Sequence, residues 1–241
     1  MTSNQYKIED IPARIEFIKK TFQQMLEHET NPELPWKLVK ESSGIKIFKC
    51  AIPHKPSSIK VYKGEVILPI PIETAIIVTS SRYKHRKKWD LTLEQAETIA
   101  SISKVPISCD LIHHKVKGAL NGLVSKRESI DVIYTGESNA TVDNRKIWVT
   151  ASASYPEDAK NYPMTPGYIR AISYLCGYIF VPVENDPSLC KFVLNFCADI
   201  QMNSLSALMA DWVKPSLMIE NLSNLRNYVS TQQLNESNLK E

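Results

Sequence analysis

Glycine is scarce in this chain, with 7 among 241 residues against a typical frequency of ~7%. Neither the Walker pattern nor the glycine-rich dinucleotide fingerprint occurs, so the sequence offers no recognisable phosphate cradle. An excess of one charge is lacking too. The 29 Lys and Arg face 26 Asp and Glu, a net charge of +3, which is too small to indicate a nucleic-acid partner.

Long apolar runs and paired cysteines are also missing. No run approaches the ~18–20 apolar residues of a membrane-spanning helix, and Met1–Asp10 lacks the apolar core of a signal peptide. The five cysteines are irregularly spaced without a C-x-x-C pair, which argues against a disulfide framework and a zinc site. We therefore expect a soluble cytoplasmic protein without a metal or cofactor.

The spacing of apolar residues predicts an order of helices and strands. Helices are expected over 8–29, 72–90 and 204–229, and Pro215 should kink or divide the last one. Strands are expected over 36–40, 45–50, 59–68, 94–104, 107–117, 127–135, 145–154, 168–182 and 190–201.

A single antiparallel sheet of about nine strands must curl, because strands twist. The C-terminal helix is the long amphipathic segment available to cover the concave face. This predicts an α+β helix-grip fold with a hollow suited to an apolar ligand. We expect one monomeric domain over 1–229, with an N-terminal helix at about 8–29, a core at about 36–229 and a polar tail over 230–241.

Several local motifs follow this order. Arg86–Asp90 reads Arg-x-x-Trp-Asp, 126–134 reads KRESIDVIY, and 168–171 with 176–182 reads YIRA and CGYIFVP. Together they resemble the START (StAR-related lipid-transfer) domain, most closely its small single-domain subgroup of sterol and bile-acid carriers. The resemblance implies a carrier that holds one lipid in an internal cavity.

The resemblance also implies roles for particular residues. In relatives that carry phosphatidylcholine, the residues matching Arg86 and Asp90 line the cavity, and the arginine meets the phosphate. The alternative is a salt bridge at a helix end that supports Trp89. Some sterol-binding members place an acid–arginine pair in the cavity. By alignment these positions are His114 and Ile133, so we expect that pair to be missing here.

Two strands carry further candidates. His113 and His114 are adjacent, so they face opposite sides of the sheet. The alignment favours His114 as the inward one, where it could bind a sterol hydroxyl, although a simple core histidine is the alternative. Thr150 and Ser152 place hydroxyls on one strand face, which lines either the cavity or the solvent.

The remaining expectations concern the surface and the cavity mouth. Lys84, Lys87 and Lys88 share one helical face, which suits anionic headgroups or simply solvent. The connection around Leu120 and Leu123 is a gate loop by resemblance or an ordinary turn. Further lipid contacts are expected from Trp89, Arg170, Leu208, Met209 and Trp212.

The predicted function is non-enzymatic carriage of a lipid, foremost a sterol, between membranes, with transient contact with anionic membrane surfaces. The alternative is phospholipid transfer through Arg86 and Asp90. A hydrolase or cyclase on the same scaffold ranks lower. No serine occupies a nucleophile-elbow context and no H-E-x-x-H motif occurs, so the sequence alone assigns no catalytic residue.

Overall fold

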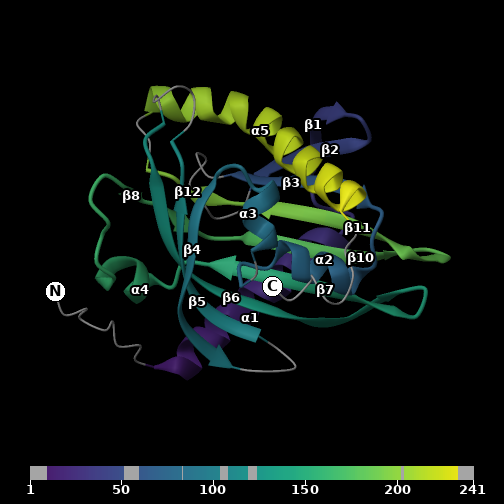
Figure 1. Cartoon of the computed structure of the whole chain (residues 1–241), viewed down its shortest axis with the longest axis horizontal. Coiled ribbons are helices and arrows are strands. Elements are labelled where there is room, and N and C mark those ends of the chain that lie inside the picture. The colour runs from purple at the N-terminus through teal and green to yellow at the C-terminus, as the bar shows by residue number, and fades with distance from the viewer. Residues whose placement is uncertain are drawn as a thin grey trace.

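In the described part of the chain, nine strands form one continuous antiparallel sheet (Figure 1). The computed structural model describes residues 10–51, 60–82, 84–103, 108–118, 124–201 and 204–232. In spatial order the strands are β1 (Lys37–Ser42), β2 (Ile45–Ala51), β3 (Lys60–Leu68), β11 (Asp186–Phe196), β10 (Cys176–Val183), β7 (Arg145–Ala153), β6 (Arg127–Val142), β5 (Ser108–Val116) and β4 (Leu93–Ser103). The expected α+β fold is confirmed.

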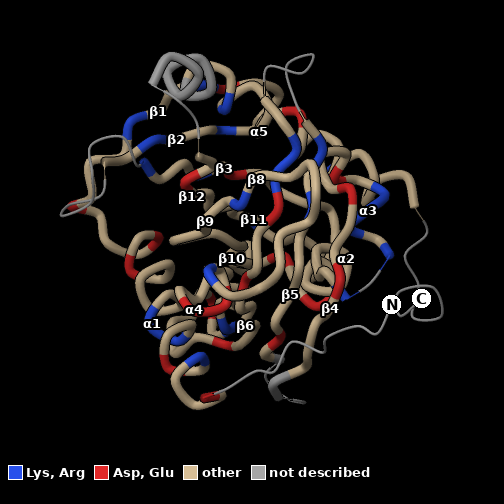
Figure 2. Tube along the Cα trace, turned by 90° about the vertical axis from the view of Figure 1, so that its left-hand side faces the viewer, with Lys and Arg blue, Asp and Glu red and all other residues tan. Residues whose placement is uncertain are grey.

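Two long helices lie on opposite sides of this sheet, as Figures 1 and 2 show from perpendicular directions. The C-terminal helix α5 (Ser204–Thr231) packs on β1, β2 and β3, whereas α1 (Ile11–Thr30) packs on β6 and β7. The shorter helices are α2 (Ile72–Thr79), α3 (His85–Trp89) and α4 (Pro156–Asn161). Helices α2 and α3 connect β3 to β4 and lie on the same side as α5.

Each face of the sheet has its own hydrophobic core, because successive side chains of a strand alternate between faces. On β11, Phe192 packs with Leu222 and Leu225 of α5. Its neighbour Val193 packs with Phe22 and the rest of the α1 core. The buried stripe of α5 recurs at three- and four-residue steps, which is the pattern of an amphipathic helix.

The structure differs from the predicted elements in several places. The segment over 72–90 is two helices, because Ser80 is extended and ends α2. The segment over 168–182 is interrupted, with the two-residue strands β8 (Ile169–Arg170) and β9 (Ile172–Ser173) ahead of β10. Helix α4 was not predicted. Pro215 lies inside α5 without dividing it.

Strands β8 and β9 are held by short pairings outside the main order. β8 pairs parallel with β6, and β9 pairs with β12 (Ala198–Asp199). All five cysteines are free thiols, and four of them are buried. Among the described helices, none is both long and apolar enough to span a membrane.

Candidate functional site

A cavity of about 190 Å³ lies on the α5 side of the sheet, between the strands and the α2–α3 turn. At roughly 10–15 Å³ for each enclosed water, this volume has room for one compact organic molecule. Strands β5, β6 and β7 supply much of its wall through alternating side chains. The described lining residues are Thr79, Ser80, Ser81, Arg82, Arg86, Leu93, Asp110, Ile112, His114, Val116, Ser129, Asp131, Ile133, Thr135, Thr150, Ser152, Ser173, Cys176, Gly177, Tyr178, Leu194, Asn195 and Phe196.

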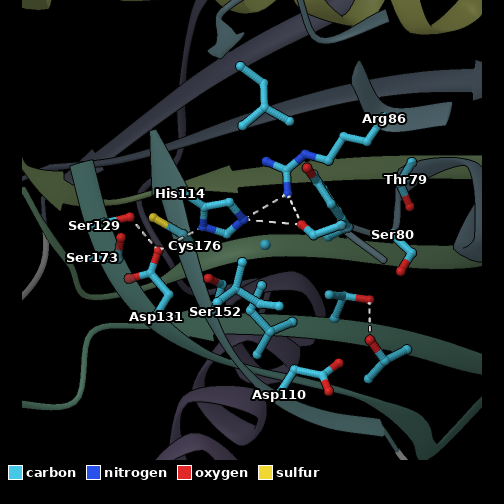
Figure 3. Close-up of a pocket in the computed structure, with 18 of the residues that line it drawn as sticks. Thr79, Ser80, Arg86, Asp110, His114, Ser129, Asp131, Ser152, Ser173 and Cys176 are labelled. Atoms are coloured by element: carbon cyan, nitrogen blue, oxygen red, sulfur yellow. Dashed lines mark hydrogen bonds and ion pairs between the residues drawn. The ribbon is translucent and has the colours of Figure 1, made fainter. Parts of the chain in front are cut away.

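A chain of hydrogen bonds crosses the cavity from the α2–α3 turn to β6 (Figure 3). Ser81 Oγ lies 3.1 Å from His114 Nε2, and His114 Nδ1 lies 3.2 Å from Asp131 Oδ2. Arg86 Nη1 donates to Ser81 Oγ over 2.6 Å. Residues far apart in the sequence therefore form one polar cluster inside the cavity.

Asp131 anchors this cluster. Burial alone would raise the pKa of its carboxyl, but hydrogen bonds from His114, Ser129 and Ser154 hold the pKa below its usual value. The Ser129 and Ser154 hydroxyls donate to it over 2.6 and 2.8 Å. A carboxylate that stays ionised and hydrogen-bonded fixes the orientation of the His114 ring.

The cavity also contains an acid–arginine pair, at positions other than the two that the alignment indicates. In the strand register Ile133 lies opposite Asp110, whereas His114 lies opposite Ser129. Asp110 accepts two hydrogen bonds, of 2.6 and 2.5 Å, from the Arg82 guanidinium. The pair is missing at His114 and Ile133, as expected, while the structure supplies another arginine from the α2–α3 turn.

Five of the expected site residues do line the cavity. They are Arg86, His114, Ile133, Thr150 and Ser152. The Thr150 hydroxyl lies 3.0 Å from that of Thr135 on the neighbouring strand. Whether these residues contact a lipid stays a prediction.

Three other expected contacts do not face the cavity. Trp89 is 2% exposed and packs in the core, where its indole N–H donates to the carbonyl of Val78 over 3.0 Å. Trp212 is 84% exposed, because it lies outside the buried stripe of α5. Arg170 points to the α1 side of the sheet and pairs with Glu128 over 2.8 Å.

Asp90 pairs with a cavity residue but does not itself belong to the described lining of the cavity. Its carboxylate ion-pairs with Arg86 Nε over 3.4 Å and accepts hydrogen bonds from Thr92 and Asn221. The salt bridge at a helix end, one of the two alternatives, therefore exists.

Four expected residues cannot be placed in this way. Leu120 and Leu123 of the expected gate loop lie outside the described residues, and so do the side chains of Leu208 and Met209. By contrast, Lys84, Lys87 and Lys88 are described, and all three are exposed.

The opposite face of the sheet holds a second buried polar cluster, centred on Glu128. His113 Nε2 lies 2.9 Å from Glu128 Oε2, and Arg170 also donates to this carboxylate. Burial would raise the pKa of Glu128, but hydrogen bonds from Thr165, Arg170 and His113 lower it to about 2. This cluster ties β5, β6 and the segment after α4 together, away from the cavity.

Among the polar cavity residues that sequence reasoning missed are Ser81, Arg82, Asp110 and Asp131. Ser81 and Arg82 fall in a segment predicted as helix, so the sequence did not predict the turn that directs their side chains into the cavity. The two acids share the strand parity of the candidates His114 and Ile133, and that parity was the available signal.

A sequence model of the START domain matches residues 20–229 of this chain. The chain belongs to the START domain family. Human StAR-related lipid transfer protein 6 is 25% identical over 193 residues, covering 79% of this chain and 80% of that protein.

Solved structures of START domains share the fold. Human StAR-related lipid transfer protein 5 superposes with a TM-score of 0.76 at 20% identity, over 92% of this chain and 98% of the other. A StAR-related lipid transfer protein from Xanthomonas axonopodis gives 0.59 at 15% identity, over 81% and 99%. Membership of the START family implies lipid binding and transfer.

Proposed function

We propose that this START domain is an intracellular carrier that holds one sterol in the cavity and transfers it between membranes. The observation that carries the proposal is the cavity itself, in which apolar side chains such as Ile112, Ile133 and Leu194 alternate with hydrogen-bonded polar groups. Burying apolar surface gains about 25 cal/mol per Å², so a hydrophobic ligand favours such a cavity over water. Carriage of this kind needs no covalent step.

A single hydroxyl group on the ligand matches the polar side chains that line the cavity. Ser152 and Thr150 present hydroxyls on one strand face, and Ser81 with His114 offers a second donor–acceptor pair. A hydroxyl both donates and accepts, so it can join such a network without leaving a buried charge.

The alternative ligand is a phospholipid held through Arg86. The guanidinium suits a phosphate, and Arg86 lines the cavity. However, it already bonds to Ser81 and pairs with Asp90. A phosphate would have to compete with both partners, so we rank the sterol first.

Contact with anionic membranes is the second part of the proposal. Lys84, Lys87 and Lys88 are exposed at α3, where Figure 2 shows a group of cationic residues. Trp212, the most exposed large apolar side chain described, projects from α5. Indole rings are enriched at membrane interfaces, and each nearby lysine adds about 1 kcal/mol of attraction. Leu120 and Leu123 stay candidates for the gate.

Vesicle-to-vesicle transfer of dehydroergosterol and of a fluorescent phosphatidylcholine tests the ligand. We expect sterol transfer to survive Arg86→Ala and to be slower at high salt. Lys46→Ala, which removes an exposed cation on β2, is the control for the loss of a positive charge. Phosphatidylcholine transfer that is lost in Arg86→Ala would select the alternative ligand. Transfer of neither lipid would overturn the carrier proposal.

A further inference from the structure

The hydrogen-bond chain inside the cavity has the connectivity of a catalytic triad. Ser81 comes from the turn after α2, His114 from β5 and Asp131 from β6. The hydroxyl meets the Nε2 atom of the ring, and the carboxylate meets the Nδ1 atom. Such triads are recognised by geometry and by role, whatever the order of the residues in the chain.

The tautomer of His114 follows from the surroundings of Asp131. Because this carboxylate is ionised and accepts from three side chains, His114 must carry its proton on Nδ1 and donate it there. The electron pair of Nε2 then accepts a hydrogen bond, and the Ser81 hydroxyl lies 3.1 Å from this atom, nearer than Arg86 Nη1 at 3.4 Å. A neutral imidazole in this tautomer is a general base for that hydroxyl.

The cavity also supplies a cation beside the nucleophile. Arg86 Nη1 lies 2.6 Å from Ser81 Oγ, where it can stabilise negative charge that develops on a carbonyl oxygen under attack. Cys176 lines the same cavity, but burial raises the pKa of its thiol to about 12. That thiol donates to the carbonyl of Cys197 over 3.3 Å, whereas the Ser81 hydroxyl has a base beside it, so the serine is the better placed nucleophile.

We propose that the cavity hydrolyses a carboxylic ester of a hydrophobic ligand, with Ser81 as nucleophile and His114 as base. Ser81 Oγ bonds to the carbonyl carbon while its proton passes to His114 Nε2. The tetrahedral intermediate collapses, and the alcohol leaves with that proton. Water then attacks the acyl-serine and gives a proton to His114. The second tetrahedral intermediate collapses, the acid leaves, and His114 returns the proton to Ser81 Oγ, which regenerates the serine and the neutral base.

The substrate class follows from the charges in the cavity. Arg82 is paired with Asp110, and Arg86 with Asp90, so neither arginine calls for an anionic substrate. A neutral ester with compact apolar groups fits the aliphatic walls and the volume. The proposal rests on the proposed carrier function in one respect, since the ester must enter the cavity by the route of the carried lipid.

Covalent labelling of the full chain with a fluorophosphonate tests this directly, together with hydrolysis of p-nitrophenyl butyrate. We expect one adduct, located on Ser81 by peptide mass spectrometry. Ser81→Ala should abolish the adduct and lower hydrolysis at least ~100-fold. Ser42→Ala is the control, because this serine is exposed on β1, away from the cavity, and its loss should leave both readouts unchanged.

Asp131→Asn separates positioning from folding. It should lower hydrolysis and change its pH profile, because the amide favours the wrong tautomer of His114, while sterol binding shows that the variant is folded. No adduct on Ser81, or equal hydrolysis by the Ser81→Ala variant, would overturn the proposal. If the protein binds sterol but Ser81 is not labelled, the hydrolase proposal fails and the carrier proposal stands. If Ser81 is labelled but the protein neither binds nor transfers lipid, the carrier proposal fails and the hydrolase proposal stands.

Discussion

His113 and His114 are neighbours on β5, yet they belong to two different polar clusters. Each lies beside a buried carboxylate of β6, Glu128 for the first and Asp131 for the second. On the α1 side, Tyr162 packs edge-on against the ring of His113, and Arg170 completes the cluster.

On the other side, the Nε2 atom of His114 points toward Ser81 in the cavity. The same pair of residue types therefore serves two purposes. Where protein covers the histidine–carboxylate pair, the pair holds structural elements together. Where the pair lies beside a cavity, the histidine presents a polar atom to a ligand. Burial alone does not distinguish them, because both residues are less than a tenth exposed.

The largest expected effect is on the cluster around Glu128. Arg170→Met leaves a carboxylate whose side chain is fully buried without its cation. We expect the free energy of unfolding to fall by about 3–5 kcal/mol, measured by urea denaturation. Lys126→Met, which breaks an exposed pair with Glu94, is the control and should change little. A loss for Arg170→Met no larger than that of the control would contradict a stabilising role.

Variants of the two histidines should differ in their affinity for sterol. Both His113→Gln and His114→Gln disturb a buried carboxylate, so we expect each to lower stability by about 1–2 kcal/mol. Only His114→Gln should weaken sterol binding, by about tenfold, since one lost hydrogen bond is worth about 1.4 kcal/mol. Equal affinities of the two variants, measured by fluorescence titration, would remove the functional distinction between the two faces.

The fold was easier to predict than the site. Strands such as 45–50 and 59–68 were predicted almost to the residue, because their apolar pattern reports burial directly. Helix α4 was missed, since it is held by long-range contacts. Its Asp158 is fully buried against Arg14 of α1, with hydrogen bonds of 2.8 and 2.5 Å.

The cavity residues show the same limit. Strand parity placed Thr150 and Ser152 on one face without saying which, and the alignment favoured His114 as the inward histidine; all three line the cavity. The partners Ser81 and Arg82 come from a turn, and no local pattern says which strand a turn will face. Trp212 was misplaced because an apolar residue on an amphipathic helix was taken to be buried.

Acid should weaken the α1-side cluster in two stages. Burial lowers the pKa of His113 below its ordinary value, ~6.5 in an unfolded chain. The unfolded state then binds protons first, so stability should fall as pH drops below that value. The pKa of Glu128 is held at about 2, so its contribution is complete above its unfolded value of ~4.3 and is lost as pH falls toward 2.

Urea denaturation between pH 7 and pH 3 measures this dependence. His113→Gln should reduce the upper stage, and Arg170→Met the lower one. A free energy of unfolding that stays constant over this range would contradict the assignment of the cluster.

Filling the cavity tests the central claim most directly. Ile133→Trp places an indole inside the cavity, whereas Ile67→Trp makes the same change at an isoleucine that is 46% exposed. Equilibrium titration with dehydroergosterol should give one bound sterol for each wild-type chain and each Ile67→Trp chain, and no measurable binding for a folded Ile133→Trp chain. Undiminished binding by Ile133→Trp would mean that the ligand lies elsewhere, and the account of this START domain as a cavity carrier would be wrong.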